Sequence, residues 1–387
     1  MFVFLLVNHG MGERVWGQKL KNIYFSKAFR RRSMGLRSFI LKRIVYSFAL
    51  ILLVILLNFM IFKSMPGDPV QFLMKPWGRE SAEVRLQQEQ LLRDLWGFGE
   101  PFEVQAVKYI RNLLTWNFGT SYIEKRPVTE SIGLRLPYTL VLLGGSAILS
   151  IILGVIIGIM VIQKRGTVVD SGAVTGSLVL GSLPTFWLGL VFLLFFYNVL
   201  RWFPNKGAFP DAWALGRPLA YAVGSSYTST SLSSVFSLDM MGAWALVAGY
   251  LRHLFLPMLT LTVFSVGGWI LLTRATMLDA ITEDYIVTAR AKGLTERAVL
   301  FRHALKNASL PIITSAALSF GFILSGAIIT ETVFTYPGLG AWTWTAIQFL
   351  DYTVLMAIFY IVSICVIAAN IVADLLYGII DPRIKYG

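Results

Sequence analysis

The stretch PYTLVLLGGSAILSIILGVIIGIMVIQ, residues 137–163, contains 27 residues and no charged side chain. About 20 helical residues cross a hydrocarbon core of about 30 Å, because each adds about 1.5 Å along the helix axis. This stretch also lacks the polar stripe at helical period that marks a surface helix of a soluble protein. We therefore expect a transmembrane helix over these residues.

Five further uncharged stretches have similar length and composition. Together the six are Ile44–Phe62, Pro137–Gln163, Ser171–Leu200, Leu254–Thr273, Asn307–Thr330 and Tyr352–Ala373. The chain is 56% hydrophobic and only 14% charged, whereas charged residues make up about a quarter of a soluble domain. The sequence thus predicts an all-α membrane protein with six core transmembrane helices. A seventh stretch, Met240–Leu251, is too short to span and is expected to be interfacial or re-entrant.

Basic residues are concentrated ahead of the first span. Residues 1–43 hold ten basic side chains and one acidic one. Lys and Arg collect on cytoplasmic flanks, so we expect the N-terminus in the cytoplasm, and six spans return the C-terminus there. The segment from Lys63 to Arg135 holds ten basic and nine acidic residues, as suits a translocated loop. The net charge of +13 is thus read as an orientation signal rather than a nucleic-acid-binding surface.

These boundaries divide the chain into parts. The predicted order is a basic cytoplasmic extension (1–36), the first transmembrane helix (37–63), an extracytoplasmic segment (64–136), a core with five transmembrane helices (137–380) and a cytoplasmic tail (381–387). The core contains an extracytoplasmic insertion (205–249) and a cytoplasmic loop (274–308). Met34 offers a second possible start just before the first span, so residues 1–33 are either a true extension or a misplaced start.

Two features inside the predicted spans suggest special geometry. Pro184 lies near the middle of the third stretch, beside Ser182 and Thr185, where a proline frees a backbone carbonyl and permits a kink. Such a bend could line a pore or be purely structural. Gly154 and Gly158 stand four residues apart in the second stretch, a spacing that favours close helix packing.

The loop between the fourth and fifth stretches is much longer than a turn. Its mixed charges alone would suit a solvated connection. Gly293 follows one helical pattern, as a glycine past a helix C-terminus does, and Thr295 is placed to cap the N-terminus of the next helix. The sequence therefore predicts a helix, a sharp turn and a second helix in the cytoplasm.

The same loop carries a resemblance. Ala289-Arg290-Ala291-Lys292-Gly293-Leu294, followed by Arg302-His303-Ala304-Leu305-Lys306-Asn307, resembles the coupling loop of permease subunits in binding-protein-dependent ABC importers, in the dipeptide and oligopeptide branch. The likeness covers most of the chain beyond about residue 36. The further motifs that carry it are Pro66-Gly67-Asp68-Pro69, Gly119-Thr120-Ser121, Arg135-Leu136-Pro137, Ser182-Leu183-Pro184-Thr185-Phe186-Trp187-Leu188-Gly189, Glu331-Thr332-Val333-Phe334, Pro337-Gly338-Leu339-Gly340, Asp374-Leu375-Leu376-Tyr377 and Asp381-Pro382-Arg383. The broad family's loop often opens with Glu-Ala-Ala, where this chain has Val287-Thr288-Ala289, and its Leu-Pro falls later here, at Leu310-Pro311.

The resemblance implies a set of partners in the cytoplasmic membrane of a prokaryote. They are membrane lipid, a second homologous permease subunit, two ATP-binding subunits and an extracytoplasmic substrate-binding protein. The residues implied to couple to the ATPase are Asp284, Tyr285, Thr288, Ala289, Arg290, Ala291, Lys292, Gly293, Leu294, Arg302 and His303. ATP and magnesium would bind to the partner subunits, and this chain itself would hold no cofactor or metal. The implied cargo is a peptide, with an oligosaccharide or nickel as alternatives within the branch.

Other function classes fit less well. The chain has no Gly-x-x-x-x-Gly-Lys-Ser/Thr loop, so nothing in it would cradle ATP phosphates. An ion-coupled secondary transporter would place ionisable residues inside its spans, whereas Glu331 and Asp374 lie at predicted span ends. An intramembrane enzyme is disfavoured because no His-Glu-x-x-His motif occurs, and the three histidines lie near the N-terminus or at membrane boundaries.

Overall fold

The computed structural model describes residues 36–64, 82–97, 99–121, 123–208, 240–322 and 327–380. Within these ranges nearly every residue outside the turns is helical, and the only extended pairing is an isolated bridge between Thr120 and Pro127. The all-α prediction is therefore confirmed for the described part of the chain. The predicted tail, all but the last residue of the predicted extension, and residues 209–239 of the predicted insertion lie outside it.

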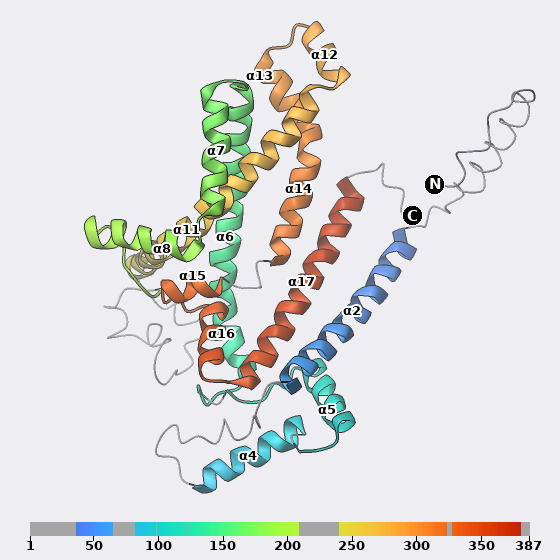
Figure 1. The fold of residues 1–387 in the computed structure, drawn as a ribbon, viewed down its shortest axis with the longest axis vertical. Helices are drawn as coiled ribbons and strands as arrows, with labels where there is room; N and C mark the ends of the chain where they lie inside the picture. Colours follow the sequence, from blue (N-terminus) through green and yellow to red (C-terminus); the bar gives the residue numbers. More distant parts are fainter. Residues whose placement is uncertain are drawn as a thin grey trace, which may run out of the picture.

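The described part of the chain is a succession of helices. In chain order they are α2 (Leu36–Ser64), α4 (Ala82–Trp96), α5 (Phe102–Leu114), α6 (Val128–Gln163), α7 (Val168–Ser182), α8 (Thr185–Phe192), the π-helix η1 (Leu193–Val199), α11 (Met240–Ile281), α12 (Asp284–Ala291), α13 (Glu296–Ala298), the π-helix η2 (Val299–Ala304), α14 (Leu305–Phe322), α15 (Ile328–Val333), α16 (Leu339–Gln348) and α17 (Tyr352–Ile380). Figure 1 shows α12 and α13 at one end of the molecule and α4 and α5 at the other. Between these ends α11 packs on α6 and α7, α14 on α17, and α17 on α2.

Three helices are long and apolar enough to cross a membrane, namely Val128–Gln163, Val247–Ile281 and Tyr352–Val372. Val168–Ser182 and Thr185–Val199 make a fourth crossing if this bent pair is one span. Helices α2 and α14 occupy the first and fifth predicted spans. The chain is thus a multi-pass membrane protein, and the total of six spans stays a prediction.

The third predicted span is broken in the middle. Helix α7 ends at Ser182 and α8 begins at Thr185, and their axes differ by 98°. Pro184 has no N–H to continue the helical ladder, and the Leu183 N–H instead reaches the Leu180 carbonyl at 3.4 Å. The predicted proline bend is confirmed, and it is a break rather than a gentle curve.

The stretch Met240–Leu251, expected to be interfacial or re-entrant, does not form a re-entrant segment. These residues form the first turns of α11, a continuous helix of 42 residues that ends at Ile281. The predicted insertion 205–249 therefore ends inside a helix. The predicted cytoplasmic loop 274–308 likewise begins with residues that still belong to α11.

Helix α11 continues through Arg252 and His253, although their polarity suggested a membrane boundary. The Arg252 guanidinium donates hydrogen bonds to the Trp202 carbonyl at 2.6 and 3.0 Å. His253 Nδ1 lies 2.8 Å from the Gly249 carbonyl oxygen, one turn earlier in the helix. Both side chains thus have hydrogen-bond partners within a continuous helix.

Helices α6 and α11 approach each other unusually closely. A Cβ on Gly154 would lie 2.2 Å from Trp269 Cβ, and a Cβ on Gly158 would lie 2.7 Å from Thr273 Cβ. Only glycine leaves room for this contact, so the packing role predicted from the glycine spacing is confirmed.

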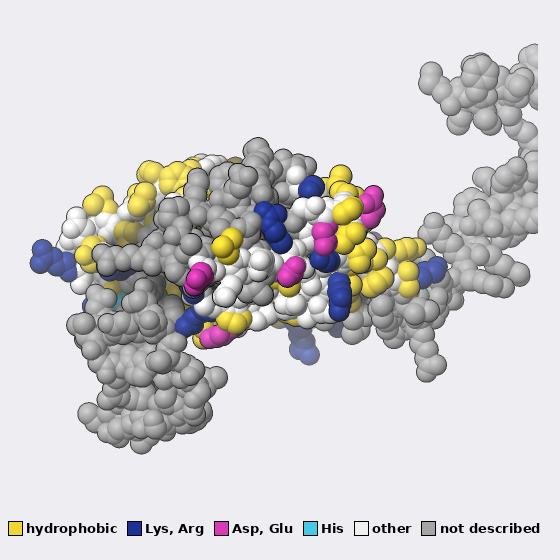
Figure 2. Space-filling view, turned by 90° about the horizontal axis from the view of Figure 1, so that it is seen from below, with side chains coloured by type: hydrophobic (Ala, Val, Ile, Leu, Met, Phe, Trp, Pro, Cys, Tyr) yellow, Lys and Arg dark blue, Asp and Glu magenta, His cyan; other side chains and the backbone are white. Residues whose placement is uncertain are grey.

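The end of the molecule that carries α4 and α5 exposes both charged and apolar side chains, Phe102 and Val107 among the latter. Figure 2 views this end and shows basic and acidic side chains interspersed, in keeping with the balanced charge of this segment. Helix α4 within it carries charged side chains along its length, among them Glu83 and Arg93. Helix α6 begins at Val128, before its apolar stretch, and Ser121 Oγ donates a 2.7 Å hydrogen bond to Asp351 ahead of α17. This bond ties the α4–α5 end to the helical core.

Candidate coupling site

The segment between α11 and α14 projects from one end of the helical core. It consists of α12, a four-residue connection (292–295), α13 and η2. Figure 1 shows α12 and α13 beyond the end of α7, away from the α4–α5 end. The position makes this segment accessible to a partner protein.

Gly293 forms the sharp turn that the sequence predicted. Its φ is +75°, a left-handed conformation that costs other L-residues about 1–2 kcal/mol. Its N–H donates to the Arg290 carbonyl at 2.9 Å, and the Lys292 N–H donates to the Thr288 carbonyl at 3.1 Å. These bonds satisfy carbonyls at the end of α12.

Thr295 starts the second half of the segment. Its side-chain oxygen accepts a hydrogen bond from the Ala298 N–H at 3.4 Å, and its carbonyl accepts one from the Val299 N–H at 3.0 Å. The predicted N-cap is therefore confirmed.

One face of the segment is anchored in the core. The buried apolar residues of this cluster come from α6, α11, α12, η2 and α14, and they are Ile159, Ile162, Met277, Ala280, Ile286, Ala289, Val299, Leu300, Ala304 and Ala308. Ile286 is fully buried. Because side chains from both halves enter one close-packed cluster, the segment is supported as a rigid unit on the ends of α6 and α11.

The opposite face is open to solvent. Among the eleven residues predicted to couple, Ala289 is buried and both Tyr285 and His303 are half-buried. The others are exposed, and they are Asp284, Thr288, Arg290, Ala291, Lys292, Gly293, Leu294 and Arg302. Two exposed apolar side chains, Val287 (61% exposed) and Phe301 (46%), were not singled out from the sequence. The helical spacing of Val287 from Arg290 and Ala291 could have indicated it.

Arg290 is engaged within the segment itself. Its guanidinium donates hydrogen bonds to the Glu296 carboxylate at 2.7 and 3.2 Å, joining α12 to α13 across the turn. These hydrogen bonds lower the pKa of Glu296 and raise the pKa of Arg290. The pair is therefore present at neutral pH and is lost only as the pH falls through the lowered pKa of Glu296. Both side chains are exposed, so the pair adds little to stability.

Residues 150–386 match the family described as the inner membrane component of binding-protein-dependent transport systems, and residues 36–143 match its N-terminal membrane component. The chain belongs to this permease family. The segment from α12 to η2 lies within the larger match.

Individual permeases are similar over nearly the whole chain. The oligopeptide transport system permease protein AppB of Bacillus subtilis is 33% identical over 350 residues, which are 90% of this chain and 99% of that protein. The di/tripeptide transport system permease protein DppB of Pseudomonas aeruginosa is 34% identical over 349 residues, with the same two shares. The probable D,D-dipeptide transport system permease protein DdpB of Escherichia coli is 35% identical over 340 residues, 86% of this chain and 93% of that protein.

Asp170 and Arg274 brace the permease just below the coupling segment. Arg274 donates to the two Asp170 carboxylate oxygens at 2.6 and 2.9 Å, and the Gly166 N–H donates to one of them at 3.0 Å. Asp170 is buried at the start of α7, and Arg274 belongs to α11. The bidentate pair fixes α7 to the helix that carries the coupling segment.

The three residues proposed for a pore or gate lie at the break between α7 and α8. Ser182 and Pro184 are exposed, and Thr185 is half-buried. Ser182 Oγ donates to the Leu178 carbonyl at 2.7 Å, a bond within α7. In the described part of the permease, no three His, Cys, Asp or Glu side chains come together in a way that could hold a metal ion.

Glu331 is the functional candidate that sequence reasoning missed. Its position suggested the end of a span, but its side chain is 0% exposed. The carboxylate accepts hydrogen bonds from Thr139 Oγ1 and from the Ala341 N–H, both at 2.9 Å. A buried acid that is bonded in this way ties distant parts of the permease together.

Proposed function

We propose that this chain is a transmembrane permease subunit of an ATP-driven importer that moves peptides across the cytoplasmic membrane of a prokaryote. It would pair with a second permease subunit, two ATP-binding subunits and an extracytoplasmic substrate-binding protein. ATP and magnesium would bind to the ATPase partners. This chain contributes the path and the coupling, not the hydrolysis.

The observation that carries the proposal is the nearly full-length likeness to permeases named for oligopeptide, di/tripeptide and dipeptide transport. A likeness confined to the coupling loop would support only an ATP-driven importer. Here the likeness also covers the predicted spans and the α4–α5 end.

The coupling segment supports a lever mechanism. The buried face of the segment packs against the ends of α6, α11 and α14. An ATPase subunit that binds the exposed face of α12 would therefore transmit its movement to these helices. Exposed Val287, Lys292 and Phe301 offer an apolar and basic contact surface. Closure of the ATPase dimer would then change access to the path between permease subunits.

Transport measurements test the substrate and the energy source. In cells that depend on this permease, we expect uptake of a labelled dipeptide or tripeptide to require ATP and to survive an uncoupler. Uptake that collapses with the uncoupler while ATP is maintained would indicate an ion-coupled transporter. Competition by an oligosaccharide or by nickel, but not by unlabelled peptide, would assign the cargo to another class.

Gly293 tests the lever. We expect Gly293→Val to abolish transport, because a β-branched residue is strained at a φ of +75°. Gly293→Asn is the matched control, since asparagine adopts this conformation more readily. Normal uptake in the valine variant would contradict the role of the turn, provided that both variants assemble with the ATPase subunits.

We also propose six membrane crossings with both termini and the coupling segment in the cytoplasm. A single labelling site tests this orientation, with Lys292→Cys introduced after Cys365→Ser. A membrane-impermeant maleimide should label inverted vesicles and not intact cells. Labelling of intact cells would place the segment outside.

A further inference from the structure

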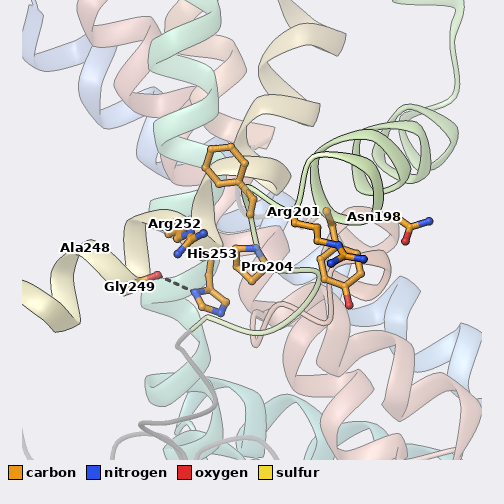
Figure 3. Close-up of a pocket in the computed structure, with 9 residues that line it drawn as sticks. Asn198, Arg201, Pro204, Ala248, Gly249, Arg252 and His253 are labelled. Atoms are coloured by element: carbon orange, nitrogen blue, oxygen red, sulfur yellow. Dashed lines mark hydrogen bonds between the residues drawn. The ribbon is translucent and has the colours of Figure 1, made fainter.

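A pocket of about 740 Å³ lies far from the coupling segment, between the end of η1 and the first turns of α11. Its lining residues are Tyr197, Asn198, Arg201, Phe203, Pro204, Ala248, Gly249, Arg252 and His253. Figure 3 shows Arg252 and His253 on the α11 side and Arg201 on the opposite side, with Pro204 between them. The proposed transport function assigns no role to this pocket.

The pocket is rich in hydrogen-bond donors and positive charge. Two arginines and a histidine line it, and none of its described lining residues is acidic. Arg252 is held in place by the Trp202 carbonyl, while Arg201 is exposed at the opposite wall. Guanidinium groups present planar forks of N–H donors that match phosphate and carboxylate oxygens. The chemistry of the lining thus selects an oxyanion.

The pocket also lies at the boundary of the membrane core. One candidate span ends at Val199, and the next begins at Val247, so the lining residues occupy the ends of both. Tyr197 and Trp202 are exposed here, and aromatic residues of these types are enriched at membrane–water interfaces. Leu194 and Phe195 of η1 are apolar and exposed as well.

We propose that this pocket binds the phosphate headgroup of an anionic phospholipid, whose acyl chains lie against the exposed apolar face of η1. A free phosphate would use the arginines but leave the adjoining apolar surface unused. The volume exceeds what one phosphate group needs and lies within the usual range of about 300–1,000 Å³ for small-molecule sites. The lipid would fasten the end of the broken third span to the start of α11.

Lipid titration of the purified full-length transporter complex tests the proposal by native mass spectrometry. We expect phosphatidylglycerol to bind at least about tenfold more tightly than phosphatidylcholine with the same acyl chains. Arg201→Gln should lower the phosphatidylglycerol affinity by about tenfold, because it removes a charge-assisted contact. Lys206→Gln is the matched control, since Lys206 is exposed nearby but does not line the pocket, and it should leave the affinity unchanged.

Several outcomes would overturn the proposal. One is equal affinity for the two lipids, and another is an unchanged phosphatidylglycerol affinity in an Arg201→Gln variant that elutes as an intact complex. Displacement of the lipid by millimolar inorganic phosphate, with equal binding of glycerophosphate, would assign the pocket to a free oxyanion. Weaker docking of the substrate-binding protein in Arg201→Gln, with unchanged lipid affinity, would assign it to an acidic protein surface. Peptide uptake is measured separately, so these results stand apart from the transport assignment.

Discussion

Thr139 Oγ1 donates a 2.9 Å hydrogen bond to Glu331, although 192 residues separate them in the chain. The same hydroxyl oxygen accepts a bond from the Leu339 N–H at 2.8 Å, and the Glu331 carboxylate accepts another from the Ala341 N–H. Both side chains are fully buried. One carboxylate therefore holds α6, α15 and the start of α16 in register.

Replacing Glu331 by alanine should destabilise the permease. The change leaves the buried donors of Thr139 and Ala341 without their acceptor, at about 1–3 kcal/mol for each group. We expect a clear drop in melting temperature in detergent, and a smaller drop for Glu331→Gln, which keeps one acceptor oxygen. The neighbouring Thr332→Val is the control, because the Thr332 hydroxyl donates to the Ile328 carbonyl in its own helical turn. An unchanged melting temperature in Glu331→Ala would show that the carboxylate does not brace the fold.

Two glycines of α6 should respond differently to replacement by alanine, because only one of them lies in the contact with α11. Gly154→Ala places a methyl group 2.2 Å from Trp269 Cβ and should cost about 1–3 kcal/mol through overpacking. Gly144→Ala meets nothing within 4 Å, so it should be neutral or slightly stabilising. Thermal unfolding of the two variants measures the difference. Equal melting temperatures would argue against close packing of these helices.

The pair of Asp170 and Arg274 should affect coupling as well as stability. Asp170→Asn removes the charge that receives both arginine donors, and we expect a lower melting temperature. Arg274→Lys keeps the charge but not the two parallel bonds, so it should retain more stability yet transport less peptide for each ATP hydrolysed. Lys164→Gln in the adjoining turn is the control. A normal ratio of transport to hydrolysis in Arg274→Lys would limit the pair to a structural role.

A charge swap tests how Arg290 acts. Arg290→Glu and Glu296→Arg each break the pair across the turn and should each reduce ATP-driven transport. The double variant restores an opposite-charge pair, so we expect it to recover most of the activity, with little change in stability throughout because the pair is exposed. Failure of the double variant would mean that Arg290 itself contacts the ATPase. Uptake and ATPase rates of the three variants distinguish these results.

Local chemistry explains which features were predictable from the sequence. The turn at Gly293 depends on one glycine and the capping Thr295, both within a few residues of the helices they end or begin. The break after Ser182 likewise follows from the missing N–H of Pro184. Whether the coupling residues meet a partner depends on contacts outside this chain, so that assignment stays a prediction.

Long-range partners explain the features that were missed. The sequence placed the start of the fourth span at Leu254, after Arg252, because the acceptor of Arg252, the Trp202 carbonyl, lies 50 residues earlier in the chain. Glu331 looked like a span end because Thr139 is distant in sequence. The sequence does hold one local signal, because Gly338 and Gly340 follow Glu331 closely. In the structure, a Cβ on Gly338 would lie 2.3 Å from the Glu331 carboxylate. A glycine-rich turn just after an acid can thus mark a buried carboxylate.

The glycine contacts between α6 and α11 also restrict where cargo can travel. A single methyl group has no room at Gly154 or Gly158, so neither an acyl chain nor a peptide side chain can pass along this seam. The translocation pathway therefore has to use other faces of the two helices. Cargo therefore passes around the contact at Gly154 and Gly158 and not between the two helices there.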